Sequence, residues 1–304
     1  MPYQTVALAA AFVGSSIAAI WDLKTTEIPD SIPYIMIAVA LLTYGVQSYV
    51  EGNFSIIANS MIAGLSLLGF GFVLYYLGQW GGGDAKLLSA VGFLLPVVPL
   101  GFSEVILPLP SILGFLEQFK FPIVYVFNLF VVGAVYMIAY AVGMTALNKG
   151  IQDRFMREVK LNSRKLLLSL FIIFISSLAF HGFWLGLIGI PVSFTIIASD
   201  LFLAIGITSL FVLFLFAKAV EEVGFKKRIP ISQLKVGDVP MDFKLWEGIT
   251  EKDLRKMRRS GKKFILIKDG IRFAPAFPIA LMFTLIFGNS ILLFVSLGIS
   301  VALY

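Results

Sequence analysis

The 304-residue sequence lacks cysteine altogether and contains a single histidine, His181. The missing cysteine excludes a disulfide framework, a thiolate nucleophile and a cysteine-ligated zinc or iron–sulfur site. The single histidine argues against a Ser-His triad and against a histidine-cluster metal site. Charged residues are also scarce, at 14% of the chain against roughly 25% in an average soluble protein.

What the sequence has in excess is apolar residues, which make up 59% of it and give a mean hydropathy of +0.93. One soluble core of this size cannot hide so much apolar surface, so we expect the bilayer to surround most of it. A spanning helix needs about 20 mostly apolar residues. Eight segments qualify: 4–21, 31–50, 54–77, 86–107, 121–147, 166–188, 193–217 and 275–303. The predicted fold class is an all-α polytopic membrane protein of about eight transmembrane helices.

Lysine and arginine determine the predicted orientation. With the N-terminus outside, the cytoplasmic segments are 22–30, 78–85, 148–165 and 218–274. Of the 24 basic residues, 23 lie in these segments or at their edges, and only Lys120 lies elsewhere. The positive-inside rule therefore predicts a multi-pass protein of the cell membrane with both termini outside.

The segment 218–274 is the one long polar stretch, and we predict that it forms a small cytoplasmic α+β insert. Strands and turns are expected within 231–243, a helix from Thr250 to about Ser260, and a strand at 264–267. The predicted division of the chain is thus seven helices in 1–217, the insert in 218–274, and a last helix in 275–304.

The basic charge of the protein is concentrated in that insert. Residues 221–272 hold 14 basic and 8 acidic residues, which accounts for the whole net charge of +6. In a membrane protein such charge indicates orientation and contact with anionic lipid headgroups rather than nucleic acid. The segment 148–165 is also basic. Its pattern fits either an amphipathic helix on anionic lipid or a helix extension with a solvated face.

Three aspartates lie near membrane depth, where an acidic side chain is costly and usually functional. Asp22 closes the first span, Asp84 opens the fourth, and Asp200 lies within the seventh. Because two spans separate Asp22 from Asp84, both reach the cytoplasmic boundary and can meet there. Asp200 lies near the outer end, where Ser193 and its neighbours Thr195 and Ser199 favour a hydrogen-bonded structural acid.

A close pair of carboxylates carries a recognisable chemistry. Like charges do not both ionise cheaply, so the pair shares one proton. One carboxylate takes a proton from water as the water attacks an amide carbonyl, and the other donates a proton. This reaction needs no metal, thiol or histidine. Helix dipoles suggest that Asp84, at a helix N-terminus, is the ionised base and Asp22 the protonated acid.

Three glycines, Gly81, Gly82 and Gly83, come directly before Asp84. Without side chains they allow the backbone to pass close to a substrate strand or to adopt a positive φ. Three glycines alone would also suit an ordinary loop between helices. Followed at once by an aspartate and Lys86 at a membrane boundary, they indicate a functional loop.

These residues resemble a known family. The run 81–84, Gly-Gly-Gly-Asp, matches the GxGD motif of membrane aspartyl proteases, and 83–87 resembles the second motif of type IV prepilin peptidases. The run 22–29 resembles their first motif, an aspartate followed six and seven residues later by an aliphatic residue and a proline. More loosely, 270–275 resembles a Gly-aliphatic-Pro-Phe-x-Pro pattern of the same family.

The resemblance implies that Asp22 and Asp84 are the catalytic pair of a cofactor-free endopeptidase. The implied substrates are prepilin- or prearchaellin-type precursors, whose short basic leader (a class III signal peptide) is cut at the cytoplasmic face. The zinc-binding cysteine domain of the bifunctional bacterial members is missing here, so N-methylation is not implied. The sequence is closer to the archaeal prepilin and preflagellin peptidases, which also carry a soluble insert.

Four further residues complete the predicted site. Glu27 and Asp30 can pair with the basic residues of a leader, although a solvated loop with helix-capping acids accounts for them as well. Lys86 either lowers the pKa of the nearby Asp84 or simply marks the inner face. Pro29 belongs to the first motif.

Two alternatives stay open from the sequence. An intramembrane protease of the presenilin or signal-peptide-peptidase kind shares GxGD. Its first aspartate normally follows tyrosine, however, whereas Trp21 precedes Asp22 here, and its Pro-Ala-Leu motif is only Pro-Ala-Phe at 275–277. An ion transporter would instead use Asp22, Asp84 and Asp200 along one path, which the predicted clustering of the first two argues against.

Overall fold

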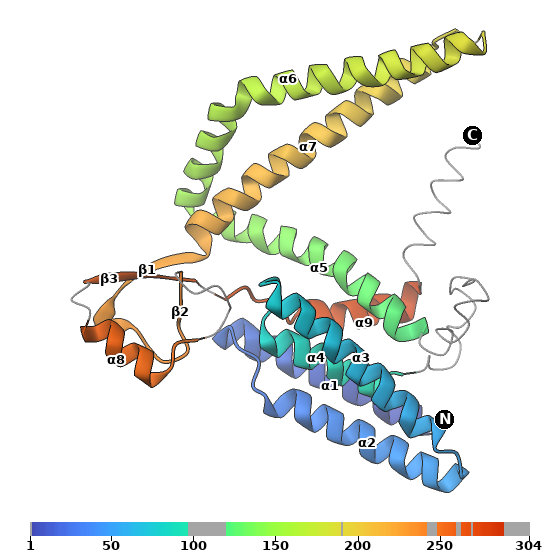
Figure 1. Ribbon diagram of the computed structural model, residues 1–304, viewed down its shortest axis with the longest axis vertical. Helices are drawn as coiled ribbons and strands as arrows, with labels where there is room; N and C mark the ends of the chain where they lie inside the picture. Colours follow the sequence, from blue (N-terminus) through green and yellow to red (C-terminus); the bar gives the residue numbers. More distant parts are fainter. Residues whose placement is uncertain are drawn as a thin grey trace. The chain divides into compact units, whose positions relative to one another are not determined.

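The computed structural model describes residues 2–96, 120–189, 191–241, 248–259, 263–268 and 270–288. The chain forms two compact units. One combines Met1–Ala139 with Ile229–Tyr304, and the other is Tyr140–Arg228. The helices and strands of both units are labelled in Figure 1.

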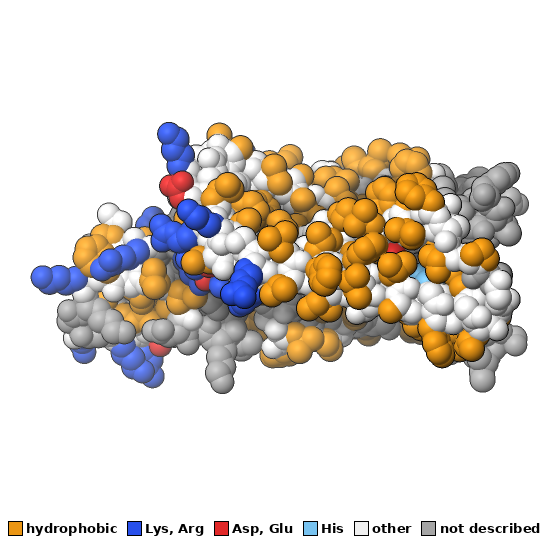
Figure 2. Space-filling model, turned by 90° about the horizontal axis from the view of Figure 1, so that it is seen from above, with side chains coloured by type: hydrophobic (Ala, Val, Ile, Leu, Met, Phe, Trp, Pro, Cys, Tyr) orange, Lys and Arg blue, Asp and Glu red, His pale blue; other side chains and the backbone are white. Residues whose placement is uncertain are grey.

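Among the described residues, six helices are long and apolar enough to cross a membrane. They are α1 (Pro2–Thr25), α2 (Ser31–Glu51), α3 (Ser55–Tyr76), α5 (Lys120–Leu147), α6 (Lys149–Leu187) and α7 (Phe194–Gly224). Large apolar side chains face outward along them, as lipid contact requires. Figure 2 shows many hydrophobic side chains on one face of the molecule. The predicted class of a polytopic all-α membrane protein is confirmed.

The other two predicted spans are described only in part. The helix α4 (Gly82–Leu94) begins where the fourth span was predicted, and α9 (Ala276–Phe287) begins the eighth. Residues 97–107 of the fourth span and 289–303 of the eighth lie outside the described residues.

The helix α4 is the buried centre of the first unit and packs against α1, α2 and α3. Small residues permit this close approach: a Cβ at Gly71 of α3 would lie 2.8 Å from the Cα of Ala85. Hydroxyl groups add hydrogen bonds between helices. Ser89 donates to the carbonyl of Gly64 at 2.9 Å, and Tyr44 donates to that of Leu94 at 2.6 Å. This packing fixes the start of α4, where Asp84 lies.

Polar side chains also fasten α9 within the first unit. The Asn128 amide nitrogen of α5 donates to the Gly288 carbonyl at 2.6 Å and to the Thr284 hydroxyl at 3.0 Å. Tyr125 donates to the carbonyl of Phe277 at 3.2 Å. These hydrogen bonds hold the start of α9, and with it the chain segment that leads into α9, in a fixed position.

The polar insert is a small α+β fold, as predicted. Its elements are β1 (Lys226–Pro230), η3 (Ile231–Gln233), β2 (Val239–Pro240), α8 (Glu251–Arg259) and β3 (Phe264–Lys268), with strand order β1-β3-β2. The strand β2 runs antiparallel to β3, with Val239 opposite Lys268. Thr250 caps α8, because its hydroxyl accepts the Asp253 N–H at 3.3 Å and its own N–H donates to the Asp253 carboxylate at 3.2 Å.

The start of the insert differs from the prediction. Helix α7 continues to Gly224, so the insert begins several residues later than 218. The reason is that Ala219 and Val220 are buried, which extends the packed face of α7 beyond its apolar run. Similarly, α6 is one continuous helix from Lys149, so the basic segment 148–165 is an extension of the apolar helix.

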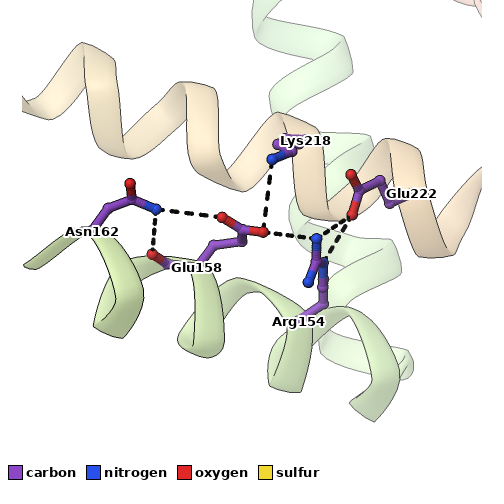
Figure 3. Close-up of polar contacts among 5 residues, drawn as sticks. All are labelled: Arg154, Glu158, Asn162, Lys218 and Glu222. Atoms are coloured by element: carbon purple, nitrogen blue, oxygen red, sulfur yellow. Dashed lines mark hydrogen bonds and ion pairs between the residues drawn. The ribbon is translucent and has the colours of Figure 1, made fainter.

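A charged network joins α6 to α7 where both helices become polar (Figure 3). Arg154 donates to Glu222 at 2.8 Å and pairs with Glu158 at 2.7 Å, and Lys218 lies 3.7 Å from Glu158. The Glu158 side chain is only 9% exposed. A carboxylate so buried needs its cationic partners, because an unpaired buried charge is strongly destabilising.

Asp200 joins the same two helices further along. It is 1% exposed, accepts a hydrogen bond from the Ser177 hydroxyl, and lies 2.8 Å from Nδ1 of His181. The expected neighbours are not its partners, since Ser199 bonds to its own helix and Ser193 caps α7. Both observed partners come from α6 because the side chain points between the helices. Asp200 is therefore an interhelical acid.

We expect Arg154→Met to loosen the pairing of α6 with α7, because it removes a shared partner of Glu158 and Glu222. The free energy of unfolding should fall by about 1 kcal/mol. It can be measured by titration with SDS in mixed micelles. Arg157→Met, an exposed arginine of the same helix, is the matched control and should change little. Equal effects of the two substitutions would contradict this role of the network.

Candidate active site

Asp22 lies in the last turn of α1 and is only 4% exposed. Its Oδ2 accepts a hydrogen bond of 3.0 Å from the backbone N–H of Ala274, which precedes α9. The guanidinium of Arg272 donates to the carbonyl of Leu23 at 3.1 Å. The end of α1 is therefore tied to the segment that leads into α9, more than 240 residues away in sequence.

Asp84 lies in the first turn of α4. Gly81 caps the helix in an extended conformation, and its N–H donates to Oδ2 of Asp84 at 3.2 Å. None of the three glycines has a positive φ, so that expectation is wrong. Close approach is the observed reason for glycine: a Cβ at Gly83 would lie 3.0 Å from the Cβ of Ile28. The two sequence motifs thus touch each other directly.

The two aspartates line one cavity of about 600 Å³. Burial, together with the negative charge of Asp22, raises the pKa of Asp84 to about 7. Asp84 thus holds a proton near neutral pH, while the Ala274 N–H stabilises a negative charge on Asp22. This favours Asp84 as the acid and Asp22 as the base, the reverse of the assignment from helix dipoles. The dipole argument fails because it ignores burial and neighbouring charge.

The part of the chain that contains both aspartates is similar in sequence to known proteins. Residues 9–141 match the type IV leader peptidase family. The matched range contains both aspartates and all three glycines, and the resemblance predicted from the two motifs is confirmed.

Archaeal relatives are similar to the same region. A preflagellin peptidase of Methanocaldococcus jannaschii is 33% identical over 116 residues, which cover 38% of this chain and 48% of that protein. A preflagellin peptidase of Methanococcus voltae is 28% identical over 156 residues, or 50% and 63% of the two chains. The prepilin peptidase EppA of Methanothermobacter thermautotrophicus is 32% identical over 78 residues, or 26% and 20%. The chain thus spans about half the length of the first of these relatives.

The segment 270–277 supports the two-aspartate site from outside the matched range. Phe273 packs against Trp80, with ring centroids 5.6 Å apart, and a Cβ at Gly133 would lie 2.8 Å from its ring. The Tyr136 hydroxyl donates to the carbonyl of Arg272 at 2.9 Å. These contacts fix the neighbouring Ala274 N–H on Asp22. The loose Gly-x-x-Phe-x-Pro pattern was the only signal of this role in the sequence.

The predicted supporting residues have different locations. Glu27 lines the cavity, whereas Pro29, Asp30 and Lys86 do not. Lys86 pairs with Asp30 at 2.6 Å and lies over the ring of Tyr34, 5.9 Å from its centre. The expectation that Lys86 lowers the pKa of Asp84 is therefore wrong. Its ammonium group is held by another carboxylate.

Several lining residues were not predicted from the sequence. Thr26 has a φ of 61°, a strained conformation for a β-branched residue, and its N–H donates to the Asp22 carbonyl at 2.8 Å. The insert contributes Lys235–Val239 and Gly248 to the lining. Across the described part of the chain, no three His, Cys, Asp or Glu side chains gather as metal ligands.

We expect Asp22→Asn to lower the pKa of Asp84, because the neutral amide no longer repels the Asp84 carboxylate. Infrared spectra recorded across a pH titration should show the protonated carboxyl band of Asp84 disappearing at a lower pH than in the wild type. The same band should be missing from the spectrum of Asp84→Asn, which identifies it as the band of Asp84. An unchanged midpoint in Asp22→Asn would show that the two carboxylates are not electrostatically coupled.

Proposed function

We propose that this protein is a membrane aspartyl endopeptidase that removes the basic leader from prepilin- or prearchaellin-type precursors. The observation that carries the proposal is the single cavity that holds both Asp22 and Asp84. The family match over 9–141 and the names of the archaeal relatives support the same activity.

In the proposed reaction, the ionised Asp22 takes a proton from a water molecule, which attacks the scissile amide carbonyl. The Ala274 N–H stabilises the charge of Asp22 before this step. The protonated Asp84 donates its proton to the carbonyl oxygen or to the leaving nitrogen. Each catalytic step therefore uses one carboxylate as base and the other as acid.

The glycines before Asp84 have a part in this proposal. Gly81 and Gly82 line the cavity and have no side chain that would fill it. An extended substrate backbone can therefore approach Asp84 closely. Gly83 keeps α4 against Ile28, which holds the two motifs together.

The cavity is proposed to face the cytoplasm, with both termini outside. The distribution of lysine and arginine supports this orientation, since nearly all of them lie on one predicted side. The basic face of α8, which includes Lys252 and Lys256, is proposed to contact anionic headgroups.

The contacts of the three aspartates do not support the alternative that the protein is an ion transporter. It requires three aspartates along one path. Asp22 and Asp84 share a cavity, whereas Asp200 faces Ser177 and His181 between α6 and α7. The presenilin-like alternative has no described contact in its favour.

Purified protein should cleave a precursor that carries a basic leader, and Asp22→Asn and Asp84→Asn should each reduce the rate at least about a thousandfold. Both variants should still express and insert, because each replacement keeps the size of the side chain. Cleavage products can be identified by mass spectrometry. Asp200→Asn is the control acid and should stay active. Full activity in either dyad variant would contradict the proposed mechanism.

The pH dependence follows from the raised pKa of Asp84. Asp84 acts as an acid only while protonated, so kcat/KM should fall as the pH rises through about 7. Initial cleavage rates at low substrate concentration, measured from pH 5 to pH 9, test this expectation. Activity that instead rises through this range would contradict the role of Asp84 as the acid and would favour the reverse assignment.

A further inference from the structure

The cavity that holds the two aspartates has walls from two distant parts of the chain. One wall is the membrane domain, with the loop 25–28 and the segment 79–84. The other wall is the polar insert, with Lys235–Val239, Gly248 and Ile267. A peptide in the cavity therefore touches the insert as well as the membrane helices.

The charge of the cavity is opposite to that of the insert. Among the residues that the structure describes, the lining contains four acidic side chains, Asp22, Glu27, Asp84 and Asp238, and one lysine, Lys235. The insert as a whole carries far more basic than acidic residues. Apart from Lys235, the described lysines and arginines of the insert therefore lie outside the cavity lining. Two of the four carboxylates, Glu27 and Asp238, have no part in the proposed chemistry.

The Glu27 carboxylate lies against the turn of the insert that carries Asp238. Gly237 has a φ of 98°, and a Cβ on it would lie 3.4 Å from Oε1 of Glu27. A Cβ on Gly248 would lie only 2.4 Å from the Gly237 carbonyl oxygen, so both positions require glycine. The Glu27 side chain thus lies against the insert, at the residue next in sequence to Asp238.

The Asp238 side chain is itself held in place. Its Oδ2 accepts the backbone N–H of Lys235 at 2.7 Å, and its carbonyl accepts the N–H of Ile249 at 2.9 Å. The carboxylate is therefore fixed at the cavity wall by the turn that carries it. Little conformational entropy remains to be lost when a cationic side chain binds there.

We propose that Glu27 and Asp238 form an acidic recognition wall that binds lysine or arginine side chains of the leader. The inference rests on the proposed function and adds the residues that select its substrate. It gives the insert a direct role in binding. It also differs from the pairing expected from the sequence, because Asp30 is occupied by Lys86 and lies outside the cavity lining.

The test compares two precursors that differ only in the leader, one with its basic residues and one with glutamine in their place. Wild type, Glu27→Gln and Asp238→Asn are assayed on both precursors. Each substitution should raise KM for the basic leader about fivefold, the effect of losing one partly exposed ion pair. The kcat value and the KM for the neutral leader should not change. Asp238→Asn keeps an oxygen that can accept the Lys235 N–H.

Matched controls come from the same two walls. Asp30→Asn removes an acid from the membrane loop outside the lining, and Glu251→Gln removes one from α8, where it pairs with Arg255 at 2.9 Å. Neither should change the preference for the basic leader. A charge reversal distinguishes altered recognition from a folding defect, because a folding defect cannot increase activity. Asp238→Lys should cleave a precursor with glutamate in place of the basic leader residues faster than the wild type does.

The outcomes separate the two ideas. If the wild type cleaves neither precursor, the proposed function fails and the recognition wall fails with it. If the wild type cleaves the basic leader but Glu27→Gln and Asp238→Asn retain its KM, only the recognition wall is overturned. The same holds if Asp238→Lys does not gain activity on the acidic leader.

Discussion

The interaction on which the site depends is the repulsion between two largely buried carboxylates that line one cavity. Asp22 and Asp84 would avoid each other if the chain were free, because bringing like charges together costs free energy. The fold holds them in place with strong constraints on both sides. Helix α4 is buried among α1, α2 and α3, and Gly83 packs on Ile28. The consequence is a pair that keeps one proton near neutral pH, which is the property that acid–base cleavage of an amide needs.

The support of Asp22 comes from a segment far away in the sequence. The backbone N–H of Ala274 reaches its carboxylate only because Phe273 is wedged against Trp80 and over Gly133. A backbone donor carries no sequence signature of its own, since every residue except proline has one. The aromatic contacts therefore act on the site indirectly, by fixing where the peptide group points.

The insert illustrates how a net charge can mislead when it is assigned to a whole segment. Its composition is basic, which suits a segment on the inner side of a membrane. The turn that it presents to the cavity nevertheless carries an acidic side chain, Asp238, and the Glu27 carboxylate lies near Gly237 of the same turn. Under the function and the recognition wall proposed above, this separation of the two signs lets one small domain face anionic lipid and a cationic peptide at once.

The sequence by itself determined the membrane class and the six long helices that the structure describes, because long apolar runs need a bilayer. It also singled out Asp22 and Asp84, because acidic side chains near membrane depth are costly and usually have a function. It also predicted the capped helix at Thr250 from local hydrogen-bonding chemistry. It could not predict that Asp30 pairs with Lys86, that Ala274 supports Asp22, or that Asp238 and Glu27 line the same cavity. Each of these contacts joins residues that are far apart along the chain, and no spacing rule encodes them. Because the partners in these contacts come from separate elements, only the packing of those elements decides which backbone groups and charges meet at the cavity.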